Sequence, residues 1–227
     1  MTEKRHPATF DEEILHSQES GVVQTQTEEE RLSRVRRELE MGFGALDGIG
    51  PAISIFGSAR TPEDHPEYAA ARELARRLGE RGYSIITGGG PGAMEAANRG
   101  ARDAGAHSVG LNIELPFEQH PNPYLDTSLE FHYFFTRKVM FVRYSSGFVV
   151  FPGGFGTLDE AFEALTLEQT DKVFDFPVVL VGTEFWGGLV EWIGDKLLGN
   201  KKIGAADMGL LYVTDDLDQV MARLGLR

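Results

Sequence analysis

The segment from Pro152 to Glu160 combines glycines, a hydroxyl and acids. It reads Pro-Gly-Gly-Phe-Gly-Thr-Leu-Asp-Glu and joins an apolar run (147–151) to a helical pattern (158–169). A glycine turn between a strand and a helix lets backbone N–H groups and the helix N-terminus converge on an anion. Three glycines leave room for a phosphate: Gly153, Gly154 and Gly156. Thr157 adds a hydroxyl, and Glu160 follows about one turn later on the same side. We therefore predict a phosphate cradle beside a carboxylate, which suits chemistry on the sugar of a nucleotide.

Glu160 also has a purely structural interpretation. Asp159 and Glu160 fall in the first turn of the predicted helix, where the helix dipole favours acids. The dipole accounts for one of these acids, but it gives no reason for the glycines before them.

Two further glycine-bearing turns follow predicted strands. One is Gly57-Ser58, and the other spans residues 88–94, with Gly89, Gly90, Gly92 and Met94 as candidate ligand contacts. The second turn fits the pattern G-x-G-x-x-A, a short match of low specificity. A plain tight turn needs one glycine rather than four in five positions, so ligand contact is the favoured interpretation.

Arg137 and Lys138 begin a predicted helix over residues 136–145. Positive charge at a helix N-terminus opposes the helix dipole, so a bound phosphate or Glu160 would have to compensate it. The alternative is a solvated basic pair on the surface, and composition does not choose between the two. Glu118 lies in a proline-bounded loop and is a candidate lid residue.

Apolar runs alternate with helical patterns along most of the chain. Strands are predicted at residues 52–56, 83–87, 108–112, 129–135, 147–151, 177–181 and 211–213. Helices are predicted at residues 66–81, 93–104, 136–145, 158–169 and 184–198, with a last helix capped by Asp215. This order predicts an α/β, Rossmann-like, doubly wound and mainly parallel sheet with helices on both faces. The glycine turns then share one edge of the sheet, where such folds bind ligands.

The domain prediction is an N-terminal arm and helix (1–46) followed by one nucleotide-binding domain (47–227). Residues 1–26 are polar and are expected to be flexible or loosely attached. Thr27 is the expected N-cap of a helix that places Leu32, Val35 and Leu39 on one face. That face packs on a partner subunit or on its own domain, and we favour the second.

The composition and charge of the chain exclude several kinds of site and partner. The 227 residues contain no cysteine, carry a formal net charge of −13 and include six scattered histidines, so we expect no disulfide and no metal site. The negative charge argues against nucleic acid as a partner, but a mononucleotide needs only a local positive field. We find neither a membrane-spanning run nor the apolar core of a signal peptide, and we expect a cytoplasmic protein.

Taken together, these motifs resemble those of the LONELY GUY family of cytokinin riboside 5′-monophosphate phosphoribohydrolases, long labelled "possible lysine decarboxylases". Pro152 to Glu160 matches the signature P-G-G-x-G-T-x-x-E in full, and Arg137 to Met140 matches a second signature, R-K followed by Met. The resemblance covers about residues 50–225. It implies a Rossmann-like fold, a homodimer or larger homo-oligomer and a site near the subunit interface. It further implies that Arg137 and Glu160 are catalytic, that residues 153–157 hold the 5′-phosphate and that other positions contact substrate, namely Glu118, Lys138 and Thr166.

Three features depart from the family pattern. Ser146 stands where many members have Asp, and Glu95 stands where many have Gly after the methionine of the glycine element. The N-terminal arm is absent from short members and resembles that of the longer bacterial subgroup.

The function predicted from these residues and the resemblance is hydrolysis of the N-glycosidic bond of a nucleoside 5′-monophosphate, without cofactor or metal. The substrate would be AMP or an N6-modified AMP such as a cytokinin riboside monophosphate, and hormone production and nucleotide salvage both stay open as roles. A non-catalytic nucleotide sensor or carrier is the main alternative, and a nicotinamide-dependent oxidoreductase rests on the short fingerprint alone. Lysine decarboxylation normally uses pyridoxal on a Schiff-base lysine, and we find no lysine in a fitting setting.

Overall fold

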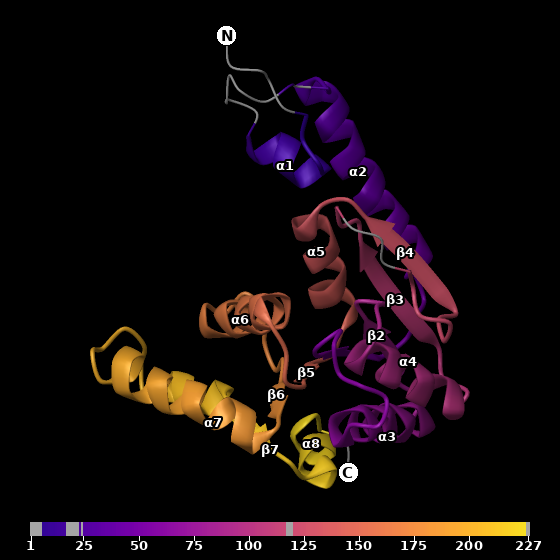
Figure 1. Cartoon of the computed structure of the whole chain (residues 1–227). Coiled ribbons are helices and arrows are strands. Elements are labelled where there is room, and N and C mark those ends of the chain that lie inside the picture. Colours follow the sequence, from indigo (N-terminus) through magenta and orange to yellow (C-terminus); the bar gives the residue numbers. More distant parts are fainter. Residues whose placement is uncertain (1–5, 17–22, 24, 117–119, 226–227) are drawn as a thin grey trace.

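A computed structural model of the chain describes residues 6–16, 23, 25–116 and 120–225. In this part of the chain seven parallel strands form one sheet in the order β4-β3-β2-β1-β5-β6-β7 (Figure 1). The strands are β1 (Ala52–Phe56), β2 (Ser84–Thr87), β3 (Ser108–Ile113), β4 (Thr127–Phe131), β5 (Phe148–Val150), β6 (Val178–Val181) and β7 (Tyr212–Thr214). The predicted doubly wound α/β sheet is confirmed.

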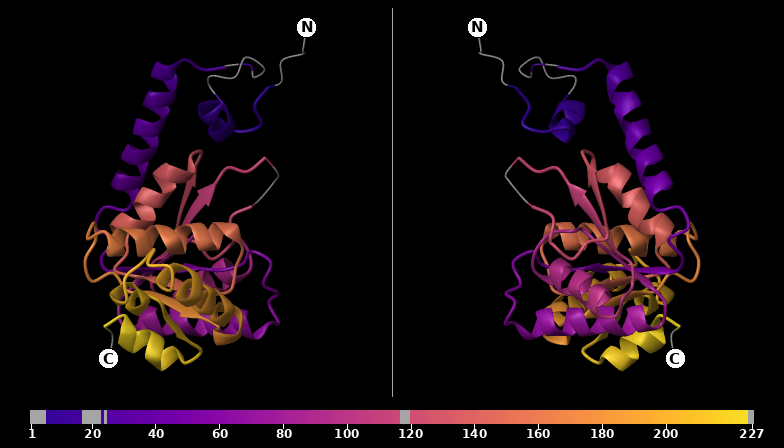
Figure 2. Two further views of the ribbon diagram at one scale, coloured as in Figure 1. Left: turned by 90° about the vertical axis from the view of Figure 1, so that its left-hand side faces the viewer. Right: turned by 90° about the vertical axis from the view of Figure 1, so that its right-hand side faces the viewer.

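Helices cover both faces of the sheet (Figures 1 and 2). One face carries α3 (Pro66–Glu80), α4 (Ala93–Asp103) and α8 (Leu217–Arg223). The other carries α2 (Glu28–Ala45), α5 (Phe134–Tyr144), α6 (Phe155–Gln169) and α7 (Thr183–Trp192), which continues as a π-helical segment, Ile193–Leu198. A short 3-10 helix, Ala206–Leu210, precedes β7 and was not predicted. Within the described residues, no helix has both the length and the apolar character needed to cross a bilayer.

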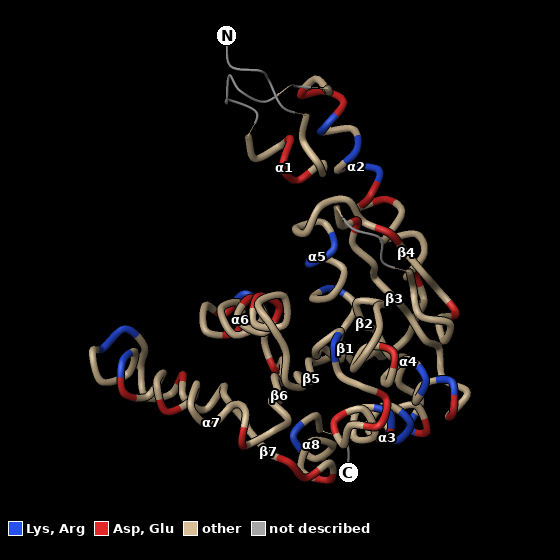
Figure 3. Tube along the Cα trace, viewed as in Figure 1, with Lys and Arg blue, Asp and Glu red and all other residues tan. Residues whose placement is uncertain are grey.

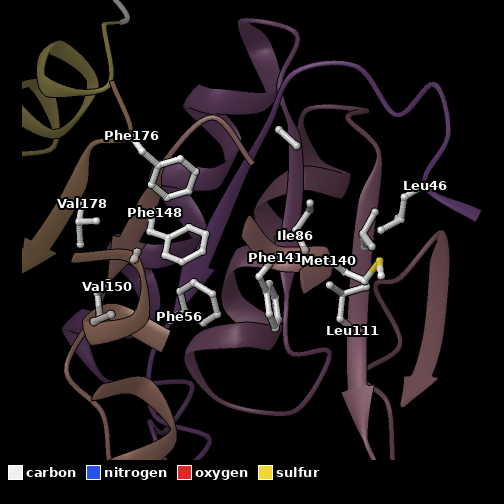
Figure 4. Close-up of a cluster of buried hydrophobic side chains, with 14 of the residues drawn as sticks. Leu46, Phe56, Ile86, Leu111, Met140, Phe141, Phe148, Val150, Phe176 and Val178 are labelled. Atoms are coloured by element: carbon white, nitrogen blue, oxygen red, sulfur yellow. The ribbon is translucent and has the colours of Figure 1, made fainter. Parts of the chain in front are cut away.

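Two hydrophobic cores lie on opposite faces of the sheet, because side chains alternate along each buried strand. In β1, Ile53 and Ile55 pack toward α3 and α4, whereas Phe56 packs toward α5. The ring of Phe56 meets the ring of Phe141 edge-on at 4.8 Å and that of Phe148 at 4.9 Å (Figure 4). Such aromatic pairs add to the free energy of burial, so they fix α5 against the ends of β1 and β5.

The strand order reverses beside β1, whose two neighbours are β2 and β5. Ligands of open α/β sheets bind in the crevice at such a switch point. The turns after β1 and β5 meet there, since the Ser58 N–H donates to the Pro152 carbonyl at 2.9 Å. Gly57 permits this approach and that of α4, because a Cβ there would lie 3.1 Å from Cβ of Phe151 and 2.6 Å from Cβ of Ala93.

The N-terminal segment is more ordered than predicted. Residues 10–15 form α1 (Phe10–Leu15), and Glu13 is buried, accepting hydrogen bonds from the N–H of Thr25, the hydroxyl of Thr25 and the N–H of Gln26. The prediction of a flexible or loosely attached arm is therefore wrong for these residues. It failed because the buried carboxylate is satisfied by partners that composition does not reveal.

The predicted N-cap of α2 is confirmed, because Thr27 and Glu30 form a reciprocal capping box. The predicted packing face is wrong in part, since Leu32 is 69% exposed. Leu39 is partly buried and packs against the core, as predicted, and the fully buried residues of α2 are Arg31, Glu38 and Gly42. As favoured, α2 lies on its own chain, against α5 and β4. The domain boundary at residues 46 and 47 stays a prediction.

Three boundaries in the structure differ from the predicted ones. The strand predicted at 129–135 ends at Phe131, and α5 has already begun at Phe134. The helix after the glycine turn begins at Phe155 with Gly154 as N-cap, so Thr157 lies in its first turn. Asp216, not Asp215, caps α8, whereas Asp215 accepts a hydrogen bond from the N–H of Thr183 at the start of α7.

Candidate active site

A cleft of about 1000 Å³ opens at the switch point of the sheet. The turns after β1, β2 and β5 form part of its wall. The remaining lining residues come from α4, α5, α6, the ends of β3 and β4 and the described part of the loop between these two strands. Eight of the predicted site residues line it: Gly57, Ser58, Met94, Arg137, Gly154, Gly156, Thr157 and Glu160. The fold thus brings together the two proposed catalytic residues and most of the proposed phosphate cradle.

Arg137 and Glu160 form a buried ion pair across the cleft. The Nη2 atom of Arg137 lies 3.3 Å from Oε1 of Glu160, and the two residues are 9% and 3% exposed. The guanidinium also lies near two aromatic rings, 5.2 Å from the Phe134 centroid and 5.6 Å from that of Phe141. Its buried Nε has no hydrogen-bond partner in the described part of the chain.

Burial is the main influence on the ionisation of this pair. It raises the pKa of Glu160 to about 7, although the positive charges of Arg137 and Lys138 act in the opposite direction. Burial likewise lowers the pKa of Arg137, and the charge of Glu160 opposes that change. Because its pKa lies near neutrality, the Glu160 carboxyl can exist in both protonation states at pH 7, as general acid–base catalysis requires.

The N-terminus of α6 faces the cleft and has the properties of an anion site. Its N-cap, Gly154, makes no side-chain capping hydrogen bond, and Gly154 and Gly156 each have open space where a side chain would begin. The first N–H groups of a helix lack intrahelical partners and carry the positive end of the dipole. A phosphate can therefore approach the backbone here without meeting a side chain.

Gly153 supports this turn from behind. A Cβ at this position would lie 2.2 Å from the Thr157 hydroxyl oxygen, so only glycine leaves Thr157 in place. Gly153 lines a shallower recess beside the cleft rather than the cleft itself.

Three glycines of the second turn, Gly89, Gly90 and Gly92, lie outside the lining of the cleft, whereas Gly88 is part of it. Gly92 has φ +68°, and a Cβ there would lie 2.4 Å from the Ser58 carbonyl oxygen, which accepts from Ala93 N–H. The carbonyls of Gly89 and Gly90 accept hydrogen bonds from the Asn122 side chain at 3.1 and 3.0 Å. These glycines thus shape the loop next to the cleft, and their contact with substrate stays a prediction.

Lys138 and Thr166 also lie outside the lining. The Lys138 ammonium lies 2.9 Å from Asp159 and 3.2 Å from Glu163, and the Thr166 hydroxyl donates to the Phe162 carbonyl at 2.7 Å. Their roles as substrate contacts stay predictions. Glu118 lies outside the described residues.

The structure adds lining residues that the sequence reasoning missed. They are Phe56, Ala59, Arg60, Gly88, Asn112, Ile113, Leu115, His120, Pro121, Ser128, Glu130, Phe134, Phe141 and Phe155. Asn112 and Glu130 are register partners on β3 and β4, and the Asn112 amide donates to the Ser128 hydroxyl at 3.0 Å. Asn112 is a polar residue near the end of a mostly buried strand, and this was the available signal. Within the described residues, no group of three His, Cys, Asp or Glu side chains is arranged to hold a metal.

Comparison with known proteins identifies the family. The model of the family described as "Possible lysine decarboxylase" matches residues 94–224. A curated "Cytokinin riboside 5′-monophosphate phosphoribohydrolase" of Mycobacterium tuberculosis is 32% identical over 165 residues, which are 69% of this chain and 86% of that protein. The chain therefore belongs to the family that this model describes. The recognition made from its motifs is therefore confirmed.

Other relatives carry related names. "Probable cytokinin riboside 5′-monophosphate phosphoribohydrolase LOG4" of Oryza sativa subsp. japonica is 26% identical over 186 residues, covering 80% of each chain. "Pyrimidine/purine nucleotide 5′-monophosphate nucleosidase" of Escherichia coli K12 is 32% identical over 126 residues, but the match spans 51% of this chain and 28% of that protein.

Solved structures share the fold. The "Moco Carrier Protein" from Chlamydomonas reinhardtii has a TM-score of 0.56 at 26% identity, over 77% of this chain and 95% of that one. The X-ray structure titled TM1055 has a TM-score of 0.58 at 23% identity, over 77% and 98%, and shows the fold alone.

Proposed function

We propose that this chain hydrolyses the N-glycosidic bond of a nucleoside 5′-monophosphate, AMP or an N6-modified AMP, to free base and ribose 5-phosphate. The observation that carries the proposal is the buried Glu160, whose pKa is raised to about 7 and which pairs with Arg137 in the cleft that the α6 N-terminus faces. The names of the relatives support the same reaction class.

The 5′-phosphate would bind at the N-terminus of α6, against the backbone of residues 154–157. A chain with a net charge of −13 needs a local positive field for this ligand, and Figure 3 shows that acidic segments are spread over most elements. Arg60 is an exposed cation in the cleft lining and would supply part of that field. Binding energy from the phosphate, which lies away from the reacting bond, would orient the ribose.

Glu160 would act on the reacting carbon. As the bond between C1′ and the base breaks, its electron pair leaves with the base and positive charge develops on the ribose. The Glu160 carboxylate would stabilise this charge and accept a proton from the attacking water, whose oxygen bonds to C1′. The departing base takes up one proton, so water is divided between the two products. Arg137 would hold Glu160 in place and keep part of its population ionised near pH 7.

A carrier function is the second candidate, since solved structures similar to this chain include a "Moco Carrier Protein". A carrier needs an anion cradle but has no need of a buried acid with a pKa near neutrality beside it. We therefore favour hydrolysis.

The test is a panel of nucleoside monophosphates, each paired with its unphosphorylated nucleoside, scored by chromatography for free base. Hydrolysis predicts release from AMP or isopentenyladenosine monophosphate and little release from the matched nucleosides, because these lack the anchoring phosphate. Tight nucleotide binding with no base released from any member of the panel would refute hydrolysis and favour the carrier.

We also propose that the chain forms a homodimer or larger homo-oligomer. Large apolar side chains are exposed on the two helices that Lys138 links, with Phe135 46% exposed on α5 and Phe162 38% exposed on α6. Light scattering after size exclusion should give more than one chain per particle, and Phe135→Glu should weaken assembly while Phe174→Glu, at a loop position, should not. A monomeric wild-type particle would contradict this proposal.

A further inference from the structure

The N-terminus of α5, the helix that carries Arg137, is capped by a side chain from α2. Its own N-cap residue, Tyr133, makes no side-chain capping hydrogen bond. Glu38, which is 5% exposed, accepts instead from the N–H of His132 at 3.2 Å and from that of Tyr133 at 3.4 Å. The same carboxylate accepts from the Thr136 hydroxyl at 2.6 Å and contacts Nδ1 of His132 at 2.9 Å. It therefore satisfies the N-cap N–H, which a helix N-terminus leaves open, and ties the residue before the cap and the first turn together.

A second carboxylate reaches the same helix end from α1. Asp11 accepts a hydrogen bond from the backbone N–H of Phe134, the first residue of α5. The neighbouring Phe10 holds α1 in place, since its ring lies 5.1 Å from the His132 ring and 3.8 Å from the Arg34 guanidinium. Figures 1 and 2 show α1 and α2 above the end of α5 in the main body of the fold.

These carboxylates offset the unfavourable electrostatic position of the Arg137 charge. Arg137 is the fourth residue of α5, where a positive charge is opposed by the helix dipole. Asp11 and Glu160 both act on the guanidinium as opposite charges. A carboxylate at a helix N-terminus is also favoured by the dipole itself, so Glu38 stabilises the helix that the cation destabilises. Residues 11 and 38 lie before the segment that the family model matches.

We propose that Glu38, assisted by Asp11, is a positioning residue for Arg137, so that the N-terminal helices are part of the machinery that sets the Arg137–Glu160 pair. This inference rests on the proposed function for its consequence in catalysis, but the geometry that it describes does not depend on turnover. It assigns the N-terminal arm a role in the active site, whereas a passive arm would affect only stability.

The experiment that tests the geometry is an NMR titration of the Glu160 carboxyl carbon, assigned with Glu160→Gln, in wild type and in Glu38→Gln. The charged side chains that act on Glu160 are Arg137, Lys138 and Asp159. If Glu38→Gln displaces Arg137, the pKa of Glu160 rises, because it loses an opposite charge. Loss of the Glu38 charge acting only through space would lower that pKa, so the two explanations differ in sign.

Glu40→Gln is the matched control, since Glu40 lies on the exposed face of the same helix and pairs with Arg36. It should leave the pKa of Glu160 where wild type has it. Asp11→Asn, which removes the second carboxylate without entering the core, should raise the pKa of Glu160 in the same direction as Glu38→Gln. If Glu38→Gln does not fold, the pKa of Glu160 in Asp11→Asn decides whether the carboxylates position Arg137. An unchanged or lowered Glu160 pKa in the folded variants would overturn the inference.

Steady-state kinetics distinguish a positioning role of Glu38 from a role in stability alone. Glu38→Gln should lower kcat for nucleoside monophosphate hydrolysis by about ten- to a hundredfold, the size of effect that a small misplacement of a reacting group produces, with KM changed less than about threefold. Wild-type kcat in a folded Glu38→Gln would overturn the inference and leave the proposed function standing. A wild-type protein that releases no base would refute the proposed function, while the titration would still decide the positioning of Arg137.

Discussion

Replacing Glu160 with glutamine is expected to change how the stability of the protein depends on pH. The folded structure raises the pKa of this carboxyl from 4.5 to about 7, mainly through burial. The folded state thus holds a proton at pH values where the unfolded state has released it. Stability from this group is complete below the unfolded pKa and is lost as the pH rises through the folded value.

The size of this effect follows from the two pKa values. A rise from 4.5 to about 7 corresponds to about 3 kcal/mol, at about 1.4 kcal/mol for each pKa unit. Glutamine has the shape of the neutral acid and does not titrate. The difference in unfolding free energy between wild type and Glu160→Gln should therefore shift by about 3 kcal/mol from pH 4 to pH 8, in favour of the variant at the higher pH.

Urea unfolding of both proteins across this range measures the difference directly. Glu184→Gln, at an exposed position on α7, is the control and should run parallel to wild type. A free-energy difference that stays constant from pH 4 to pH 8 would refute the assignment of a raised pKa to Glu160, and with it the proposed acid–base role.

Three further substitutions test the cradle and its surroundings. Gly156→Ala places a methyl group in open space at the α6 N-terminus, so the melting temperature should stay the same while KM for nucleotide rises about tenfold or more. The control is Gly187→Ala, in open space on α7, which should leave KM unchanged. Equal KM values for the two variants would contradict a phosphate site at the α6 N-terminus. Arg60→Met should raise KM about tenfold, whereas Lys196→Met, at an exposed position outside the cleft, should leave KM unchanged. Equal KM values for the two variants in steady-state kinetics would contradict the role given to Arg60. Gly92→Ala should lower the free energy of unfolding by about 1–3 kcal/mol in urea, because residue 92 has φ +68° and the new methyl group would meet the Ser58 carbonyl. An unchanged urea midpoint would contradict this packing.

The sequence predicted elements well where the signals are local. The helix predicted over residues 66–81 forms as α3, and its apolar side chains at helical spacing are buried: Tyr68, Ala71, Leu74, Ala75 and Leu78. The glycine turns were placed correctly because each directly follows an apolar strand. Parallel strands then bring their carboxyl ends to one edge, so eight predicted site residues meet in one cleft.

The sequence reveals least about positions whose surroundings depend on tertiary partners. Arg137 and Lys138 are adjacent in sequence, but neighbouring residues of a helix point about 100° apart, so Arg137 enters the cleft and Lys138 pairs with acids outside it. The sequence pattern did not single out Glu38, because its burial depends on donors more than ninety residues away, at the start of α5. Asn112 and Glu130 share the cleft through the register of β3 and β4, which neither strand reveals alone.

The central claim is that Glu160 takes part in cleaving a bond between base and ribose 5-phosphate. Its most direct test is the release of free adenine and ribose 5-phosphate from AMP, measured together for wild type and for folded Glu160→Gln. The account predicts equal amounts of the two products from wild type and a loss of at least about a hundredfold in kcat for the variant. Undiminished product release by Glu160→Gln, or phosphate release without free base, would contradict it.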